Sequence, residues 1–314
     1  MCQFFRTAKC VAGITFSIYR IAKSDIWLAI PPAHCVCGME KIMRIGNKNF
    51  DVEHKTYIMG ILNCTPDSFS DGGKYNDIDR AIKHVEEMIR DGADIIDVGG
   101  ESTRPGYTII IPDEEEIERV VPVIEKIKAN FDIPVSIDTY KSKVADAAVI
   151  AGADLVNDIW GCKYDKKIAD VIAKRDVACC LMHNRDLEKN PYGNDVMYDV
   201  LNDLQESIDI ALKAGVAKNK IITDPGIGFG KTLQDNLNVM NNVDWLKELG
   251  YPILLGTSKK SMIGLTLDVP KDERLEGTLV TTVMGVMKGC AFIRVHDVLE
   301  NKRAVVMTEA ILSA

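Results

Sequence analysis

The stretch TYIMGILNCTPDSFSDGG, residues 56–73, changes from an apolar run to a polar one at Asn63. Such a change is typical of the carboxyl end of a buried parallel strand, where α/β folds place their sites. The polar part contains two carboxylates, three hydroxyls, the aromatic Phe69 and a Gly72-Gly73 pair. These residue types suit a lid whose hinge is the glycine pair and whose aromatic ring covers a ligand. An ordinary surface loop is the alternative interpretation.

From this stretch onward, short apolar runs alternate with longer amphipathic segments. The strand-like runs are residues 57–62, 95–98, 135–137, 155–156, 178–182, 221–223, 253–255 and 292–295. The helical patterns are residues 79–91, 113–130, 141–151, 166–175, 195–214, 233–249, 273–288 and 298–312. Eight such units in succession predict a (β/α)8 barrel, the TIM barrel, with a doubly wound open sheet as the alternative. Before the barrel, residues 42–45 and 50–53 flank a polar turn at 46–49, a hairpin-like pattern that predicts a short hairpin at one end of the fold.

Length, composition and charge limit the classes of partner. The chain has 314 residues, of which 46% are hydrophobic, enough for one large core or two modest ones. Its formal net charge is −8 and its pI is about 5.3. An acidic chain of this kind is not expected to bind nucleic acid or an anionic membrane surface. Small-molecule substrates are expected instead, and an anionic substrate needs a local cluster of cations or backbone N–H groups.

The nine cysteines show no spacing typical of a metal site. Neither Cys35-x-Cys37 nor the adjacent pair Cys179-Cys180 matches the spacing of zinc ligands. Cys179 and Cys180 lie in an apolar run, which predicts buried thiols in a reducing cytoplasm.

Residues 1–38 differ in composition from the rest of the chain. They hold four of the nine cysteines, and four Lys or Arg residues against a single Asp. Their apolar runs are far shorter than the ~20 residues that span a bilayer, and no clean apolar stretch precedes a small-residue cleavage site, as a signal peptide requires. We interpret residues 1–38 as a disordered or dispensable extension before a catalytic domain over residues 39–314. An organellar transit peptide is the alternative.

A truncated chain that starts at Met39 is therefore expected to keep full activity and full stability, because the predicted barrel is complete without the extension. Specific activity and melting temperature, measured beside the full-length chain, check this. Loss of folding or of activity on truncation would show that the extension belongs to the working domain.

Polar or ionisable residues stand at the ends of all eight strand-like runs. In a TIM barrel the carboxyl ends of the strands meet at one face and carry the active site. Helix capping is the simpler explanation for single cases such as Asp158 and Asp297, and a surface lysine pair is the simpler one for Lys260. Capping does not explain a polar residue at every strand. The candidates fall into three chemical groups.

The first group offers acceptors and donors for a flat polar heterocycle. It consists of Asp97, Asp138, Asn157, Asp224 and Lys260. A carboxylate that accepts two N–H bonds from a ring gives specificity, because a wrong ring leaves the carboxylate unpaired. Lys260, if buried among these carboxylates, is expected to pair with one of them.

The second and third groups suit an anion and an aromatic ring. Arg294 and His296 alternate along the last strand and so point to one face, where they could bind a phosphate group. The anion group is Asn63, Thr103, Arg104, Arg294 and His296. A drier slot for an aromatic second substrate could be formed by Pro66, Phe69, Phe229 and Ser261.

Six blocks of this sequence resemble those of the dihydropteroate synthase family. The blocks are residues 63–73, 99–106, 138–139, 224–231, 258–261 and 294–296. The most specific are TPDSFSDGG and ESTRPG, and the blocks follow the family's order and spacing from about Met43 to Leu312. Two departures are Lys259, where many members have Arg, and Ile227, where Phe is common.

The resemblance implies a TIM-barrel transferase, usually a homodimer, of folate biosynthesis. It would condense 6-hydroxymethyl-7,8-dihydropterin diphosphate with 4-aminobenzoate, with Mg2+ on the diphosphate. By motif position, Asn63 would bind the metal, and Asn63, Arg294 and His296 the diphosphate. The pterin contacts would be Asp97, Thr103, Arg104, Asp138, Asn157, Met182, Asp224 and Lys260. Pro66, Phe69, Phe229 and Ser261 would line the aminobenzoate slot, and Asp138, Lys260, Arg294 and His296 would be the catalytic residues.

Two other functions remain open at this point. A methyltransferase that binds a pterin would share the barrel and the pterin carboxylates, but would not be expected to need the residue 65–73 loop or the Arg294/His296 anion site. A non-catalytic paralogue that binds a pterin or helps to assemble a partner enzyme is the other. Release of diphosphate from the two substrates separates both from the synthase.

Overall fold

The computed structural model describes residues 6–9, 15–20, 27–30, 42–64, 74–101 and 110–314. The chain divides into two compact units, Met1–Met39 and Glu40–Ala314. In the first unit, β1 (Arg6–Lys9), β2 (Thr15–Arg20) and β3 (Trp27–Ile30) form a three-stranded antiparallel sheet. The remaining residues of the predicted extension lie outside the described residues. That residues 1–38 are dispensable stays a prediction.

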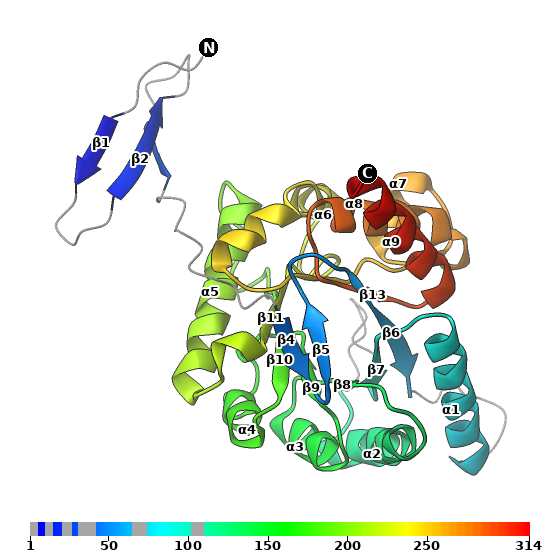
Figure 1. Cartoon of the computed structure of the whole chain (residues 1–314). Helices are drawn as coiled ribbons and strands as arrows, with labels where there is room; N and C mark the ends of the chain where they lie inside the picture. The colour runs from blue at the N-terminus through cyan, green and yellow to red at the C-terminus, as the bar shows by residue number, and fades with distance from the viewer. Residues whose placement is uncertain (1–5, 10–14, 21–26, 31–41, 65–73, 102–109) are drawn as a thin grey trace. The chain divides into compact units, whose positions relative to one another are not determined.

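The second unit is built around eight parallel strands. In the sheet their order is β11, β10, β9, β8, β7, β6, β13, β12. They are β6 (Tyr57–Asn63), β7 (Ile95–Gly99), β8 (Val135–Asp138), β9 (Leu155–Asp158), β10 (Ala178–Met182), β11 (Ile221–Asp224), β12 (Leu254–Leu255) and β13 (Phe292–Val295). A parallel bridge between Thr223 and Ile253 joins the two ends of this order, and the Thr223 N–H donates to the Pro252 carbonyl over 2.9 Å. The sheet closes, so the predicted TIM barrel is confirmed (Figure 1).

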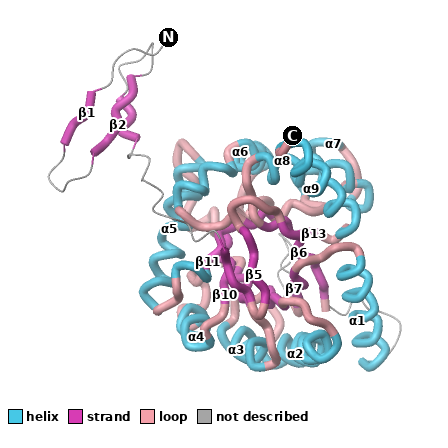
Figure 2. The backbone as a smooth tube through the Cα atoms, viewed as in Figure 1, coloured by secondary structure: helices cyan, strands magenta, loops and turns pink. Residues whose placement is uncertain are grey.

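Helices surround the strands as an outer ring, which Figure 2 shows in cyan around the magenta strands. They are α1 (Lys74–Arg90), α2 (Asp113–Asn130), α3 (Ser142–Ile150), α4 (Ile168–Arg175), α5 (Val196–Ala214), α6 (Leu233–Asn241), α7 (Ser261–Leu267), α8 (Leu275–Met287) and α9 (Val298–Leu312). Short 3-10 turns cover Lys218–Lys220, Val243–Leu249 and Lys271–Glu273.

Three helical segments differ from the prediction. Helix α1 begins at Lys74, five residues before the predicted start at residue 79. The single helix predicted over residues 233–249 is α6 followed by a 3-10 turn, because Asn242 interrupts it. The Asn242 side-chain amide donates to the Asn238 carbonyl over 2.8 Å, and such a local bond competes with helix continuation. Helix α7 was not predicted at all, since its seven residues are too few to show a helical period.

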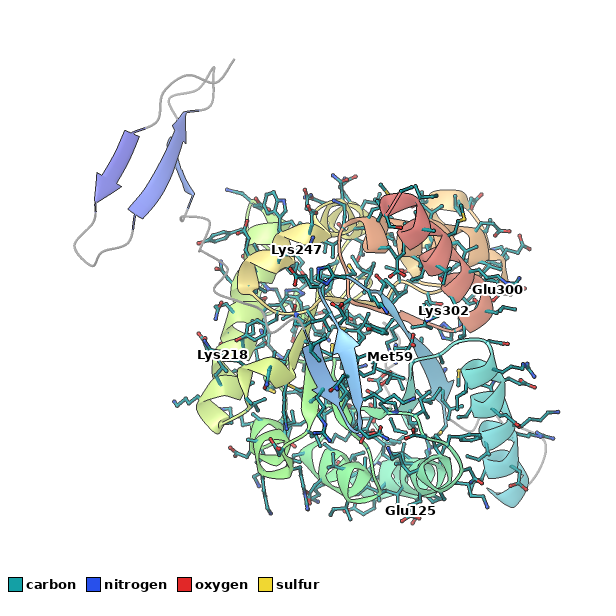
Figure 3. The ribbon with its side chains drawn as sticks, viewed as in Figure 1. Met59, Glu125, Lys218, Lys247, Glu300 and Lys302 are labelled. Carbon is teal, nitrogen blue, oxygen red and sulfur yellow. The ribbon has the colours of Figure 1, made fainter. Side chains whose placement is uncertain are left out.

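Side chains alternate along each strand between the helices and the barrel interior. On β6, Ile58 packs in the main core beneath the helices, whereas Met59 belongs to a second cluster inside the barrel. That interior cluster also contains Ile95, Leu155 and Phe292 from other strands. Figure 3 shows Met59 among the strands at the centre, where it is fully buried. The same alternation places the next inward residue of several strands one layer nearer the carboxyl ends.

A hairpin closes the amino-terminal end of the barrel, as predicted. It consists of β4 (Ile42–Ile45) and β5 (Lys48–Asp51), and its Phe50 belongs to the interior cluster. The Phe50 ring lies 4.8 Å from the Tyr57 ring and 5.7 Å from the Phe292 ring, centroid to centroid. The turn is shorter than predicted: Ile45 pairs with Lys48, which leaves two residues, and Gly46 takes a φ of +59° that suits glycine.

The described cysteines are buried free thiols, which confirms the prediction for Cys179 and Cys180; they are Cys64, Cys162, Cys179, Cys180 and Cys290. Within the described ranges, no helix is both long enough and apolar enough to cross a bilayer.

Candidate active site

Inward-facing polar side chains form a ring at the carboxyl ends of the strands. Asp97 stands two residues after the core residue Ile95 on β7, and Arg294 two residues after Phe292 on β13. Because the side-chain period of a strand is two, the apolar layer inside the barrel is followed by a polar one. Of the candidates named from the sequence, this ring contains Asp97, Asp138, Asn157, Asp224 and Arg294, and the first four are buried.

Arg294 joins two of these carboxylates. Its Nε donates to Asp97 Oδ2 over 2.6 Å and its Nη2 to Asp138 Oδ2 over 2.5 Å, while Asn157 Nδ2 donates to Asp97 Oδ2 over 3.3 Å. Burial raises the pKa of Asp138, and the Arg294 guanidinium opposes that rise. Burial also acts against the charge of Arg294, but Asp97 and Asp138 raise its pKa above the usual range. The sequence placed Arg294 in the anion group, and the structure places its guanidinium on the heterocycle group.

Each of these two carboxylates has one buried oxygen that accepts no hydrogen bond from a described residue. Asp97 Oδ1 and Asp138 Oδ1 have no hydrogen-bond partner among the residues described. A buried acceptor without a donor is costly, and native proteins rarely leave one except at functional sites. Two such acceptors on adjacent strands suit a flat ring that presents several N–H groups.

Asp224 and Lys260 stand on the other side of the ring. Asp224 Oδ1 accepts the backbone N–H of Gly226 over 2.7 Å, and burial raises its pKa. The Lys260 ammonium donates to the carbonyl of Ile227 and lies 4.3 Å from the centroid of the Phe229 ring. The expectation that Lys260 hydrogen-bonds a carboxylate is therefore wrong, because a backbone carbonyl of the neighbouring loop is nearer. Burial lowers the pKa of Lys260 to about 8, while Asp224 and Asp138 act to raise it.

The predicted anion end is only partly described. Asn63 is the last residue of β6 and is half-buried, next to Gly99 of β7. His296 follows β13 on the same face as Arg294; its Nδ1 lies 2.9 Å from Ser258 Oγ, which also accepts the His296 backbone N–H over 3.2 Å. Thr103 and Arg104 lie outside the described residues.

The predicted aromatic slot is likewise only partly described. Phe229 packs beside Met182 against the buried side chains of Tyr140 and Ile159. Ser261 is exposed at the first position of α7. Pro66 and Phe69 lie outside the described residues. Of this slot, the structure therefore brings Phe229 to the ring of polar side chains, next to Lys260.

Helix capping was the simpler explanation for two of the aspartates, Asp158 and Asp297. Asp158 accepts the backbone N–H groups of Trp160 and Cys162 over 2.8 and 2.7 Å, so it has a structural role. Asp297 makes no capping bond at the start of α9, and its Oδ1 instead accepts from Lys259 Nζ over 2.8 Å.

Ile227 is one of the two departures from the family pattern. Its side chain is fully buried in the main core beneath the helices, not at the rim of a pocket.

Two buried polar networks beside the site were not assigned from the sequence. In one, Lys141 Nζ donates to Glu101 Oε2 over 2.5 Å, to Glu116 Oε2 over 2.8 Å and to the Ile111 carbonyl over 2.8 Å. In the other, Lys231 Nζ lies 2.8 Å from His183 Nδ1. Their partners come from distant segments, so no spacing in the sequence reveals them.

Burial determines the charge of the second network. It lowers the pKa of His183 to about 4, so the imidazole is neutral near pH 7. It lowers the pKa of Lys231 to about 7, against the attraction of Asp224 and Asp203.

A dedicated metal site built from protein side chains is absent from the described part of the chain: no three His, Cys, Asp or Glu residues there are grouped to bind an ion. The Asn63 amide oxygen is a hard ligand of the kind that Mg2+ accepts. Mg2+ commonly takes one or two protein ligands and the rest from substrate phosphates and water. The donor set therefore fits Mg2+ brought with a diphosphate and does not fit a resident cage.

Comparison with known proteins agrees with this geometry. Residues 59–296 match the family model described as pterin binding enzyme. The dihydropteroate synthase of Clostridium beijerinckii is 66% identical over 271 residues, 86% of this chain and 99% of that protein. The dihydropteroate synthase of Bacillus subtilis is 55% identical over 261 residues, 83% of this chain and 90% of that protein.

Solved structures show the same likeness. A dihydropteroate synthase from Clostridium difficile, crystallised in the presence of pteroic acid, superposes with a TM-score of 0.81 at 53% identity, covering 83% of this chain and 98% of that one. The Xanthomonas albilineans enzyme with 4-aminobenzoic acid gives a TM-score of 0.81 at 37% identity, covering 87% of this chain and 99% of that one. The chain belongs to the pterin-binding enzyme family and, within it, to the dihydropteroate synthases.

Proposed function

We propose that the polar ring joins 6-hydroxymethyl-7,8-dihydropterin diphosphate to 4-aminobenzoate, giving 7,8-dihydropteroate and diphosphate for folate biosynthesis. The observation that carries this assignment to residues is the pair of unpartnered buried oxygens, Asp97 Oδ1 and Asp138 Oδ1. A pterin ring carries the amino and ring N–H donors that such acceptors require. Asn157, Met182, Asp224 and Lys260 complete the pterin site, with Thr103 and Arg104 as further contacts.

The proposed reaction is SN1-like. The bond between the pterin methylene carbon and the diphosphate oxygen breaks, and its electron pair leaves with the diphosphate. Positive charge then develops on the pterin methylene, where the fixed Asp138 carboxylate stabilises it. The aromatic amine forms the new C–N bond and loses one proton to solvent. No strong general base is required, because an aromatic amine is already nucleophilic near neutral pH.

The diphosphate is proposed to lie at the ends of β6 and β13, on Asn63, Arg294 and His296. Arg294 lies on β13 and His296 directly follows that strand, and Arg294 also bonds the two proposed pterin carboxylates. One guanidinium between the two substrate regions would couple departure of the anion to the charge on the pterin. Bound Mg2+ supplies further positive charge to the leaving diphosphate. The 4-aminobenzoate slot is proposed to lie over Phe229 and Ser261, with Pro66 and Phe69.

Diphosphate release with both purified substrates tests the assignment. Formation of dihydropteroate, dependence on Mg2+ and inhibition by a sulfonamide are expected together. Folded protein that binds a pterin without turnover would support the non-catalytic alternative. The methyltransferase alternative is disfavoured because the relatives compared above are dihydropteroate synthases.

Replacing Asn63 by alanine is expected to raise the Mg2+ concentration for half-maximal activity about tenfold, the loss typical of one metal contact. The KM for 4-aminobenzoate is expected to stay near the wild-type value, since Asn63 lies at the diphosphate end. Activity measured against Mg2+ concentration at saturating substrates checks this. An unchanged Mg2+ curve with a changed KM for the amine would place Asn63 elsewhere.

A homodimer is proposed on the outer face of α8 and α9. The two helices are joined by a bond from Thr282 Oγ1 to Asn301 Oδ1 of 2.7 Å. Figure 1 shows them as neighbours on the same side of the barrel. Large apolar side chains stand exposed on them, and contiguous exposed apolar patches typically mark protein interfaces. They are Val280, Met287, Val306, Met307 and Ile311. A cytoplasmic location, with its reducing conditions, is proposed from the free buried thiols.

The change Met307→Glu is expected to shift the chain from dimer to monomer, because it places a charge in the proposed apolar interface. Sedimentation velocity over a range of protein concentrations measures this. The control is Lys218→Glu, on a 3-10 turn that carries none of these apolar residues, which should leave the assembly unchanged. A wild-type chain that sediments as a monomer at all concentrations would contradict the proposal.

A further inference from the structure

The loop after β11, residues 226–230, lies directly on the backbone that follows β10. Gly226, Gly228 and Gly230 have φ values of +66°, +85° and +51°. A Cβ atom at Gly226 would collide with the His183 carbonyl, and one at Gly230 with the Arg185 carbonyl. Only glycine allows both the positive φ values and so close an approach to the His183 and Arg185 carbonyls. The loop therefore packs directly against the backbone that follows β10.

The Lys231 ammonium holds this loop in place with three hydrogen bonds. Its Nζ donates to the Gly226 carbonyl over 3.0 Å and to the Phe229 carbonyl over 3.1 Å. The third bond, 2.8 Å long, goes to His183 Nδ1. An ammonium group has three N–H donors, and all three are used. Gly226 and Phe229 are the two ends of one turn, since the Phe229 N–H donates to the Gly226 carbonyl over 3.1 Å.

A buried chain of hydrogen bonds fixes the ammonium in turn. In its ammonium form Lys231 can only donate, so His183 Nδ1 accepts from it, and His183 Nε2 carries the proton that it donates to Asp203 Oδ2 over 3.1 Å. Arg185 Nε donates to the same oxygen over 2.8 Å. The His183 side chain is fully buried, and Asp203 belongs to α5. The turn is therefore tied to a helix of the outer ring.

The loop in turn positions three groups of the site. The Gly226 N–H holds Asp224, the Ile227 carbonyl accepts from Lys260, and the Phe229 ring lies over the Lys260 ammonium. We propose that Lys231, held by His183 and Asp203, is a positioning residue that holds Phe229 at the 4-aminobenzoate slot. This inference rests on the proposed role of Phe229. Asp224 is the last residue of β11 and Lys260 directly precedes α7, so elements of the barrel fix their backbones, whereas Phe229 belongs to the turn that Lys231 closes.

The change Lys231→Met keeps the length of the side chain and removes its three donors. The KM for 4-aminobenzoate is expected to rise about tenfold, the effect of ~1.4 kcal/mol in binding. The KM for the pterin diphosphate is expected to change less than about threefold, which corresponds to under ~0.7 kcal/mol. Equal changes in the two KM values, or a fall in kcat alone, would overturn the proposal.

The matched control is Lys128→Met. Like Lys231, Lys128 donates from its Nζ to a backbone carbonyl, that of Ile133 over 3.4 Å; its other described bond goes to a carboxylate, Asp154 Oδ2, over 2.9 Å. These partners lie before β8 and β9, at the amino-terminal end of the barrel. The control is expected to lower the melting temperature and leave both KM values unchanged. A selective rise in the KM for 4-aminobenzoate in the control as well would refute a specific role for Lys231.

Two further measurements keep the test decisive if Lys231→Met does not fold. In Lys231→Ala, added ethylammonium is expected to restore part of the affinity for 4-aminobenzoate, while tetramethylammonium, which has no N–H donor, is not. In His183→Leu the lysine stays but loses one of its three acceptors, and a smaller rise in the KM for 4-aminobenzoate is expected. No rescue together with no selective effect in His183→Leu would overturn the proposal. A wild-type chain without condensation activity would instead refute the proposed function.

Discussion

Replacing Asp138 by alanine is expected to lower kcat roughly 10²–10³-fold, the typical effect of removing one fixed group that stabilises transition-state charge. The dissociation constant of the pterin diphosphate is expected to rise much less. The physical reason is that positive charge develops on the pterin methylene only as diphosphate leaves, so Asp138 acts mainly at that stage. Burial strengthens the effect, because the Asp138 carboxylate is shielded from water and fixed by Arg294.

Steady-state kinetics, together with calorimetric titration of the pterin substrate in the absence of 4-aminobenzoate, separate the two quantities. The control is Asp138→Asn, which keeps an acceptor oxygen for Arg294 Nη2 but removes the charge. It is expected to bind the pterin more weakly than the wild type, because an NH2 donor replaces the Oδ1 acceptor, but to lose far more in turnover than in affinity. Losses of equal size in kcat and in affinity would show that Asp138 serves ground-state binding instead.

Replacing Arg294 by methionine is expected to abolish measurable turnover and to lower the free energy of unfolding by ~3–5 kcal/mol, the usual result of leaving a buried charge uncompensated. Two carboxylates depend on this guanidinium, at 2.6 Å for Asp97 and 2.5 Å for Asp138. Without it, both carboxylates stay buried in the ring, and among the described residues the Asn157 amide is the hydrogen-bond donor left to Asp97.

The loss of stability in Arg294→Met is expected to depend on pH. Burial already raises the pKa of Asp138 in the folded wild type, and removal of the cation raises it further. A carboxyl whose folded pKa exceeds its unfolded pKa binds more protons when folded, so the stability of the variant falls as pH rises between those two values. The melting temperature of the variant should therefore lie closer to that of the wild type at pH 5 than at pH 8.

Thermal melts of both proteins across that pH range check this result. Arg294→Lys is the control, because it restores one positive charge without the fork that reaches two carboxylates. It is expected to recover part of the stability and little of the activity. A difference in melting temperature that does not vary with pH would mean that lost packing, and not the unpaired carboxylates, destabilises the variant.

Local sequence patterns were enough to predict most of the barrel. Strands such as β6 and β13 were predicted within one residue, because apolar runs between glycine-rich turns and amphipathic helices carry their own signal. The misses have local causes. Helix α7 is too short to show a period, and Asn242 ends α6 with a side-chain bond that composition does not reveal. The hairpin turn is two residues shorter than predicted, since its register depends on Phe50 packing inside the barrel.

The sequence predicted which residues belong to the site better than it predicted how they are arranged. Asp97, Asp138, Asn157, Asp224 and Arg294 were named from strand ends, and alternation does place them on the interior face. Their pairing was not predictable. Arg294 meets carboxylates that precede it by 197 and 156 residues. Lys260 was expected to pair with a carboxylate, but its ammonium donates to the Ile227 carbonyl. The path of the glycine-rich loop after β11 brings that carbonyl nearer than a carboxylate.

The sequence by itself determined the family, the barrel and the residues that face its interior, because each of these depends on local periodicity and on short motifs. Only the tertiary structure decided which charged side chains form ion pairs with one another. Closing the barrel brings β13 beside β6 and buries the ring, and burial then raises the pKa of Asp138 and lowers the pKa values of Lys260 and Lys231. The link from Lys231 through His183 to Asp203 joins two loops and a helix, so it exists only after the chain has folded.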